Sequence, residues 1–305
     1  MRSWAGAPAP AGRGETGMIL FLQSLLSGVL MGGVYALVGI GLTLVFGVMR
    51  IVNFAHGELV MLGMYLAWFL FTRLGWDPYL SLVVVAPALF LWGALLQAAV
   101  VGRALHALPE NQMLLTIGLG LAMSNAAMLA FTADYRILTT SYSSSGLQVL
   151  GLSVSEPMLA AFLVAVGVTA GLYLFLLRTD TGRAIRATAQ DREAAQLMGI
   201  DVRRMSLVAF GLGAALAGTA GALVSPTYYI YPQVGGAFTL KAFVIVVLGG
   251  MGSVVGATLG GLLVGVTESL AAVYVASDLK ELVVYSLFLL VLVARPSGLL
   301  GKARA

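Results

Sequence analysis

The sequence contains no cysteine and little charge: Lys, Arg, Asp and Glu make up 10% of its 305 residues, against 60% hydrophobic residues. A soluble domain of this length would carry roughly 25% charge. The apolar residues fall in long runs, which predicts a polytopic α-helical membrane protein, because a β-barrel would show short alternating segments instead. The lack of cysteine excludes disulfides and thiolate metal sites.

Patterns that support catalysis are also missing. The chain has no Walker-type glycine loop for ATP, no HExxH pattern, and no Ser/His pair at a useful spacing. Two histidines are too few for most metal sites. We therefore expect no enzymatic activity, no metal and no cofactor in this chain. The net charge of +4 does not indicate a nucleic-acid partner, because the basic residues concentrate in loops on one side of a membrane.

The apolar runs predict an all-α fold with nine membrane-spanning helices. A span needs roughly 20 apolar residues, so the number falls to eight if the short run at 238–248 is re-entrant. We expect one transmembrane domain over residues 18–302, after a disordered tail over residues 1–17, with Met18 as a candidate native start. The predicted spans are 18–49, 58–71, 80–101, 113–133, 158–177, 206–224, 238–248, 254–275 and 282–294.

Lys and Arg in the short loops indicate the orientation of the chain. With residues 178–205 in the cytoplasm and the N-terminus outside, eleven of the 17 basic residues lie inside. The opposite orientation reverses this bias. The external loop 134–157 would then be available to contact a partner outside the cell. The basic residues that this orientation leaves outside are Arg2, Arg13, Arg73, Arg136, Lys241 and Lys280.

The mixed-charge segment 178–205 interrupts the apolar runs. Asp191 can cap a short helix by accepting hydrogen bonds from its first amides, and Glu193 would lie in the first turn, where the helix dipole favours a carboxylate. Gly199 suits the left-handed residue that ends this helix, which would be roughly 10 Å long. Asp201 can cap the helix that follows. The segment is either a docking piece for a partner protein or a solvated loop that reverses the chain.

Side chains of this short helix suit docking. Ala194 and Ala195 give it a small face that could enter a cleft closely, while Leu197 and Met198 add apolar area. In Glu193, Ala194, Ala195 and Gly199, the segment also resembles the "EAA…G" signature of ABC importer permeases. In that family the signature forms the coupling helix that docks on the ATPase subunit.

A more specific resemblance lies in the stretch 47–65, GVMRIVNFAHGELVMLGMY. It resembles the permeases of branched-chain amino acid importers, in particular the H-type subunit that pairs with a second, different permease. The stretches 248–257 and 295–301 are similar to the same family, and the resemblance extends over residues 18–302. The N-terminal tail is the one departure, since the family does not require it.

The resemblance implies an ABC importer permease in the inner membrane of a bacterium, in contact with membrane lipid. It implies two ATPase subunits that hold ATP and Mg²⁺, a second and non-identical permease, and an external or periplasmic substrate-binding protein. The cargo implied is branched-chain amino acids. The same architecture could carry urea, short amides or other amino acids. An ion-driven carrier working alone is the alternative from another class, but it would need membrane-buried ion-binding carboxylates and no docking helix.

A polar break at about 48–57 separates the first two apolar runs. Ionisable groups within membrane segments are functional candidates. Asn53, His56 and Glu58 are therefore candidates for gating or for contact with a zwitterionic substrate. Asn53 and His56 would share a face if this segment were helical. The alternative is structural: Arg50 and Glu58 reach water at the cytoplasmic end, and Asn53 and His56 satisfy the broken backbone.

A second break contains Gly249, Gly250 and Gly252, followed by a glycine-rich helix. The two breaks together suggest an internal duplication with broken helices at the transport site, or else glycine-rich spans that merely pack closely. Glu268 is expected near the outer interface, where a carboxylate costs little free energy. His106 is expected in a solvated loop.

Overall fold

The computed structural model describes residues 13–105, 107–140, 142–143, 145–149, 152–295 and 297–300. These residues are mostly helical, and the expectation of an all-α polytopic membrane protein is confirmed, with one small hairpin added. The predictions for His106 and for residues 1–12 of the tail lie outside the described residues. The elements in chain order are α1 Arg13–Met49, α2 His56–Leu74, α3 Leu82–Ala99, η1 Val101–Ala104, α4 Pro109–Phe131, β1 Gly146–Val149, β2 Leu152–Ser155, α5 Glu156–Arg178, α6 Asp180–Gln190, α7 Arg192–Leu197, α8 Val202–Val224, α9 Val234–Gly249, α10 Val254–Tyr274, η2 Ser277–Leu279 and α11 Lys280–Ala294.

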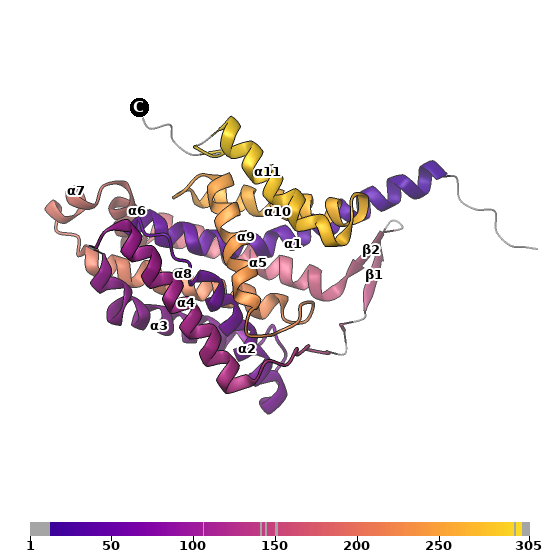
Figure 1. Cartoon of the computed structure of the whole chain (residues 1–305), viewed down its shortest axis with the longest axis horizontal. Helices are drawn as coiled ribbons and strands as arrows, with labels where there is room; N and C mark the ends of the chain where they lie inside the picture. Colours follow the sequence, from indigo (N-terminus) through magenta and orange to yellow (C-terminus); the bar gives the residue numbers. More distant parts are fainter. Residues whose placement is uncertain are drawn as a thin grey trace, which may run out of the picture.

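Nine of these helices correspond to the nine predicted apolar runs. Seven are long and apolar enough to cross a membrane, namely α1, α2, α3, α4, α5, α8 and α10. The other two, α9 and α11, have only 16 and 15 residues. At 1.5 Å per residue, α9 is about 24 Å long, which is shorter than the ~30 Å hydrocarbon core. Figure 1 shows α9 running across the direction of α1 instead of alongside it.

The core of the bundle is built on α1 and α8. In their most apolar windows 83% and 78% of the residues are buried, against 22% for α4 and for α5. In the isolated chain, α4 and α5 therefore expose most of their apolar surface. Lipid or another membrane subunit would cover these two helices, together with the exposed faces of α3 and α11.

Glycine brings α1 and α10 into backbone contact. A Cβ atom at Gly28 would lie 2.6 Å from the Cα of Val266, and one at Gly261 would lie 2.6 Å from the Cα of Ala36. Real Cβ atoms do not approach other atoms so closely, so these positions require glycine at this helix separation. Close packing is therefore confirmed as one use of the glycine-rich spans. The suggested internal duplication stays a prediction.

The two ends of the bundle are marked by different structures. Near the start of α1, Gln23 Oε1 accepts a hydrogen bond from Ser153 N of β2 at 2.8 Å. Near its end, a Cβ atom at Gly47 would lie 3.8 Å from Ala189 of α6. Figure 1 shows the β1–β2 hairpin and α7 at opposite ends of the molecule. We call these the hairpin end and the coupling end.

The hairpin was not predicted. It lies in the loop 134–157, where β1 and β2 pair antiparallel with Gly146 opposite Ser155 and Val149 opposite Leu152. Four-residue strands are too short to show a clear alternation of polar and apolar residues. It is a small addition to an otherwise helical fold.

The glycine break between α9 and α10 has the geometry that glycine permits. Gly249 is the last residue of α9, and Gly250 and Gly252 have φ angles of +98° and +87°. A side chain at either φ would be strained. Ser253 then begins α10 by accepting a hydrogen bond from Gly256 N at 3.0 Å.

Candidate functional site

The segment 178–205 contains two helices, where the sequence predicted one. The first, α6, begins where Thr179 Oγ1 accepts a hydrogen bond from Gly182 N at 3.0 Å. Ile185 and Thr188 on one face of α6 are buried against the bundle. The cap and the spacing of these two residues were the signals in the sequence that could have predicted this helix.

The second helix, α7, has the predicted caps. Asp191 Oδ1 accepts hydrogen bonds from Glu193 N at 2.9 Å and from Ala194 N at 3.0 Å. Gly199 follows with a φ of +79°. Asp201 Oδ1 accepts from Arg204 N at 3.0 Å and begins α8. The capping predictions are confirmed. Only residues 198–201 lie between α7 and the buried helix α8.

The exposed surface of α7 differs from the one expected. Ala195 is only 3% exposed and faces the protein, so it cannot form the docking face together with Ala194. Leu197 and Met198 are 88% and 81% exposed. These two large apolar side chains lie next to each other and are exposed within a charged segment between α5 and α8. We call Leu197 and Met198 the apolar tip of α7.

A polar groove lies beside α7, between it and the end of α3. It encloses about 720 Å³. Its walls carry three arginines, one acid and two amides, namely Arg103, Arg192, Arg203, Glu193, Gln97 and Gln196. This groove places charged and hydrogen-bonding groups next to the apolar tip.

The polar break after α1 turns back into the bundle. Arg50, with a φ of +56°, is exposed, whereas Asn53 is buried. Asn53 is not helical, so it does not share a helix face with His56, and that premise of the sequence analysis is wrong. Asn53 Oδ1 accepts a hydrogen bond from Ala55 N at 3.1 Å. His56 Nε2 lies 3.0 Å from Val38 O within α1, so Asn53 satisfies the backbone of the break and His56 ties the start of α2 to α1.

The start of α2 is deep in the protein. Val38, which contacts His56, lies 11 residues before Met49, or about 16 Å along α1 from its end. The segment 50–55 therefore re-enters the bundle, and α2 begins well inside it.

Glu58 is buried, which corrects the expectation that it reaches water. It is 6% exposed, and a Cβ atom at Gly235, in the first turn of α9, would overlap its carboxylate. Gly57 N donates to Thr239 Oγ1 of α9 at 3.0 Å. The first turns of α2 and α9 thus meet, and we call this contact the α2–α9 seam.

Three buried polar atoms at or next to the start of α2 have no hydrogen-bond partner among the described residues: Asn53 Nδ2, His56 Nδ1 and Glu58 Oε2. Buried polar atoms are normally paired, so an unpaired set carries a free-energy cost. Such a set is expected where a structure must open during function or where water enters. The three residues predicted as gating or pathway candidates are therefore brought together in one region.

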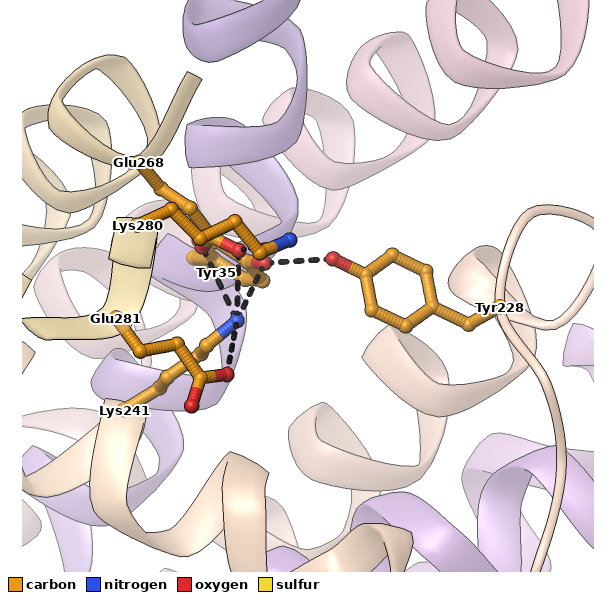
Figure 2. Close-up of polar contacts among 6 residues, drawn as sticks. All are labelled: Tyr35, Tyr228, Lys241, Glu268, Lys280 and Glu281. Atoms are coloured by element: carbon orange, nitrogen blue, oxygen red, sulfur yellow. Dashed lines mark hydrogen bonds and ion pairs between the residues drawn. The ribbon is translucent and has the colours of Figure 1, made fainter. Parts of the chain in front are cut away.

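A second cluster of charge, which the sequence analysis missed, joins four elements (Figure 2). Lys241 Nζ of α9 donates to both carboxylate oxygens of Glu268 at 3.0 Å and to Tyr35 OH at 3.1 Å. Lys280 Nζ lies 3.0 Å from Glu268 Oε1, and Tyr35 OH lies 2.9 Å from Tyr228 OH. Together with Glu281, whose carboxylate is 4.0 Å from Lys241, these six residues form what we call the ionic cluster.

The cluster corrects two expectations. Lys241 is not an external residue, and Glu268 is not at a wet interface, since their side chains are 7% and 8% exposed. An unpaired charge inside a membrane domain is costly, and each of these charges is paired with the other. One charged residue inside each of two apolar runs was the available signal, but spacing in the sequence does not show that the two meet.

The loop 134–157 is held to the connection between α2 and α3. Tyr142 OH donates to Asp77 Oδ2 at 2.5 Å, and Tyr79 OH donates to Pro157 O at 2.6 Å. Burial, followed by the hydrogen bond to Asp77 and its charge, raises the pKa of Tyr142 well above its ordinary value. Both phenols therefore stay neutral donors, which keeps this loop in a defined position at the hairpin end.

Comparison with known proteins identifies one family. A family described as "Branched-chain amino acid transport system / permease component" matches residues 24–292. The chain is 35% identical over 296 residues to the high-affinity branched-chain amino acid transport system permease protein BraD of Pseudomonas aeruginosa. That match covers 92% of this chain and 96% of BraD.

Two further relatives are informative. The permease protein LivH of Escherichia coli K12, from a high-affinity branched-chain amino acid transport system, is 32% identical over 302 residues, or 93% of this chain and 96% of LivH. The permease protein LivM of the same organism is 37% identical over 131 residues, which covers 42% of this chain and 30% of LivM. The match to LivH is end to end, whereas the match to LivM covers one part of each protein.

Proposed function

Because the chain belongs to the family of permease components of branched-chain amino acid transport systems, we propose that it is a membrane-spanning subunit of an ATP-driven importer for these amino acids. The observation that carries this proposal is the family match, which includes nearly all of the transmembrane region. The capped helix α7 with its apolar tip supports it, because an importer powered by separate subunits needs a docking piece in water. The chain itself is a transport permease and not an enzyme, and ATP and Mg²⁺ would be bound on partner subunits.

We propose four partners for the complex. Two ATPase subunits would dock on α7, and the second permease would be a different chain, as the partial similarity to LivM suggests. A substrate-binding protein would approach the hairpin end, where the loop 134–157 is held by Tyr79 and Tyr142. In this proposal the coupling end lies in the cytoplasm and the protein lies in the inner membrane.

The packing of α8 against its neighbours suggests how a movement of α7 would reach the α2–α9 seam. When the ATPases close, α7 would be displaced, and Asp201 would pass the motion to α8 because it caps that helix directly. α8 packs against α1, α2 and α3 with glycines at the contacts, among them Gly218 beside Gly63 of α2. A shift of α8 would thus move α2 and strain the α2–α9 seam, at or next to which Asn53, His56 and Glu58 have unpaired polar atoms. We propose that opening of this seam is part of the switch between the outward-open and inward-open states.

The proposal is tested by reconstituting the purified complex, with the subunits that co-purify from its host, into liposomes. We expect leucine, isoleucine and valine to be taken up only with ATP and the binding protein, and urea or short amides not to compete. Uptake without ATP by the chain alone would reject the importer in favour of an ion-driven carrier. Competition by urea but not by leucine would keep the architecture and reject the cargo.

The coupling role of α7 has its own test. Glu193→Lys and Gly199→Pro should abolish ATP-driven uptake while membrane insertion stays intact, because the first reverses a charge on α7 and the second forces φ to about −65° where +79° is needed. Gln190→Lys, an exposed change one residue before the Asp191 cap, is the matched control. Normal uptake by both test variants would mean that the segment only reverses the chain.

A further inference from the structure

A pocket opens beside the ionic cluster, between α9, the start of α11 and the connection 225–233. It encloses about 210 Å³. Its lining is aromatic and apolar at Tyr228, Tyr231 and Phe238 among others, and it also includes Lys241, Lys280 and Glu281. Aromatic walls with a few converging charged groups are typical of small-molecule sites.

The pocket reaches toward the middle of the membrane domain. Tyr35, which bonds Lys241, lies twelve residues from Gln23 at the hairpin end and twelve from Gly47 at the coupling end. At 1.5 Å per residue, each separation is about 18 Å. Charges at such a depth normally face the protein interior or a water-filled path. In transporters of several folds, substrate sites lie near this level, where broken helices meet.

Among the described residues, the charged groups of the pocket make only some of the hydrogen bonds of which they are capable. Lys280 has three N–H groups, and within the described residues its ammonium contacts Glu268 Oε1 at 3.0 Å. Within the described part of the chain, Glu281 makes one ion-pair contact, at 4.0 Å from Lys241, which is too long for a hydrogen bond. The side chains of Lys280 and Glu281 are 33% and 49% exposed, so both can reach a ligand.

The remaining members of the cluster hold these two groups in place. Glu268 accepts from both lysines and so fixes the ammonium of Lys280 (Figure 2). Lys241 Nζ is also 5.0 Å from the centre of the Tyr35 ring, and the hydroxyl of Tyr35 is hydrogen-bonded to that of Tyr228. Two lysines and two glutamates balance in charge, so a ligand that carries one charge of each sign keeps the site neutral.

We propose that this pocket binds a zwitterionic amino acid, with the carboxylate at Lys280, the ammonium at Glu281 and an apolar side chain against Tyr231 and Phe238. This inference rests on the proposed function and adds to it a site, which would receive the substrate on its way from the hairpin end. The two charges of opposite sign match the two charged groups of an amino acid, and the aromatic residues favour an apolar side chain.

Equilibrium binding of radiolabelled leucine to the purified permease complex, without binding protein, tests the inference. Glu281→Gln should weaken leucine binding about tenfold, because it removes the charge that meets the ammonium. The same variant should leave competition by 4-methylpentanoate unchanged, since this analogue has no ammonium. Lys280→Gln should do the reverse. It should weaken competition by 4-methylpentanoate, and it should not change competition by 3-methylbutylamine, which has no carboxylate.

The matched control is Asp278→Asn, which removes an exposed acid three residues before Glu281 and outside the pocket. It should bind leucine like the wild type. Leucine binding by Glu281→Gln and Lys280→Gln that equals the wild type would overturn the inference, as would the absence of saturable binding to the wild-type complex at millimolar leucine. If either result is found while the wild-type complex still takes up leucine with ATP, only the site is rejected and the proposed function is kept. A wild-type complex that takes up no leucine rejects the proposed function itself.

Discussion

Lys241 and Glu268 are buried partners, and each satisfies the charge of the other deep in the membrane domain. Desolvation of two charges offsets much of their attraction, so such a pair adds little stability compared with apolar side chains. Loss of one partner lowers the stability of the protein much more, because the other charge stays buried without its partner. A single substitution should therefore be more destabilising than the double substitution.

Lys241→Met should destabilise the protein by about 3 kcal/mol, because Glu268 loses two hydrogen bonds and keeps only Lys280. The double variant Lys241→Met with Glu268→Met should be less destabilised, since the freed Lys280 is 33% exposed and can reach solvent. Thermal unfolding followed by size-exclusion chromatography in detergent measures both. Arg73→Met, exposed at the end of α2, is the control. A double variant that is less stable than the single one would contradict this account.

Glu58 lies at the α2–α9 seam with one unpaired carboxylate oxygen. Glu58→Gln keeps its shape and removes the cost of a buried charge, so we expect a higher unfolding temperature together with slower ATP-driven uptake, because a more stable seam opens less readily. Glu110→Gln, an exposed acid in the first turn of α4, should change neither value. A lower unfolding temperature for Glu58→Gln would show that the charge stabilises the closed seam.

The sequence predicted individual residues well where the cause is local. Asp191, Asp201 and Gly199 cap helices as expected, because a cap depends on residues within a few positions of it. The burial of Glu58 and the pairing of Lys241 depend on contacts with residues far away in the chain, about which the sequence carries no direct signal. Their roles in transport stay predictions.

At the scale of elements, hydropathy located all nine apolar helices, because each has to bury or cover a long apolar surface. It missed α6 and the β1–β2 hairpin. α6 is polar on average and is stabilised by one buried face, and the hairpin is held through Gln23 of α1. Elements stabilised by contacts elsewhere in the fold leave only weak patterns in their own sequence.

Glycine sets the distance between α2 and α8. A Cβ atom at Gly63 would overlap the backbone of Gly218, so Gly63→Ala should destabilise the protein by about 1–3 kcal/mol. Gly167 of α5 has no atom within 4 Å of the corresponding position, so Gly167→Ala should stabilise by about 0.5–1 kcal/mol through helix propensity. Shifts of the unfolding temperature in detergent should have opposite signs. Equal shifts would show that α2 and α8 can separate to admit a methyl group.

At the scale of the whole molecule, two exposed surfaces of the described residues bear on the proposed complex. One is the apolar surface of α4 and α5, within the membrane domain. The other is the apolar tip of α7 at the coupling end, beside the polar groove that Arg103, Arg192 and Arg203 line. Lipid or a second permease can cover the first surface. The apolar tip of α7 lies in a charged segment outside the spans, and under the proposed function the ATPase subunits would cover it.

Leu197→Asp combined with Met198→Asp should therefore abolish co-purification of the ATPase subunits. Burial of two such side chains is worth about 1.5–3 kcal/mol each, so their loss weakens the contact by more than about a hundredfold. The second permease should still co-purify, because its surface lies in the membrane domain. Gln190→Asp, which adds one charge to the same loop away from the tip, is the control. Retention of the ATPases by the double variant would move their docking surface to the groove, where Arg103→Ala and Arg203→Ala should then release them and high salt should weaken the complex.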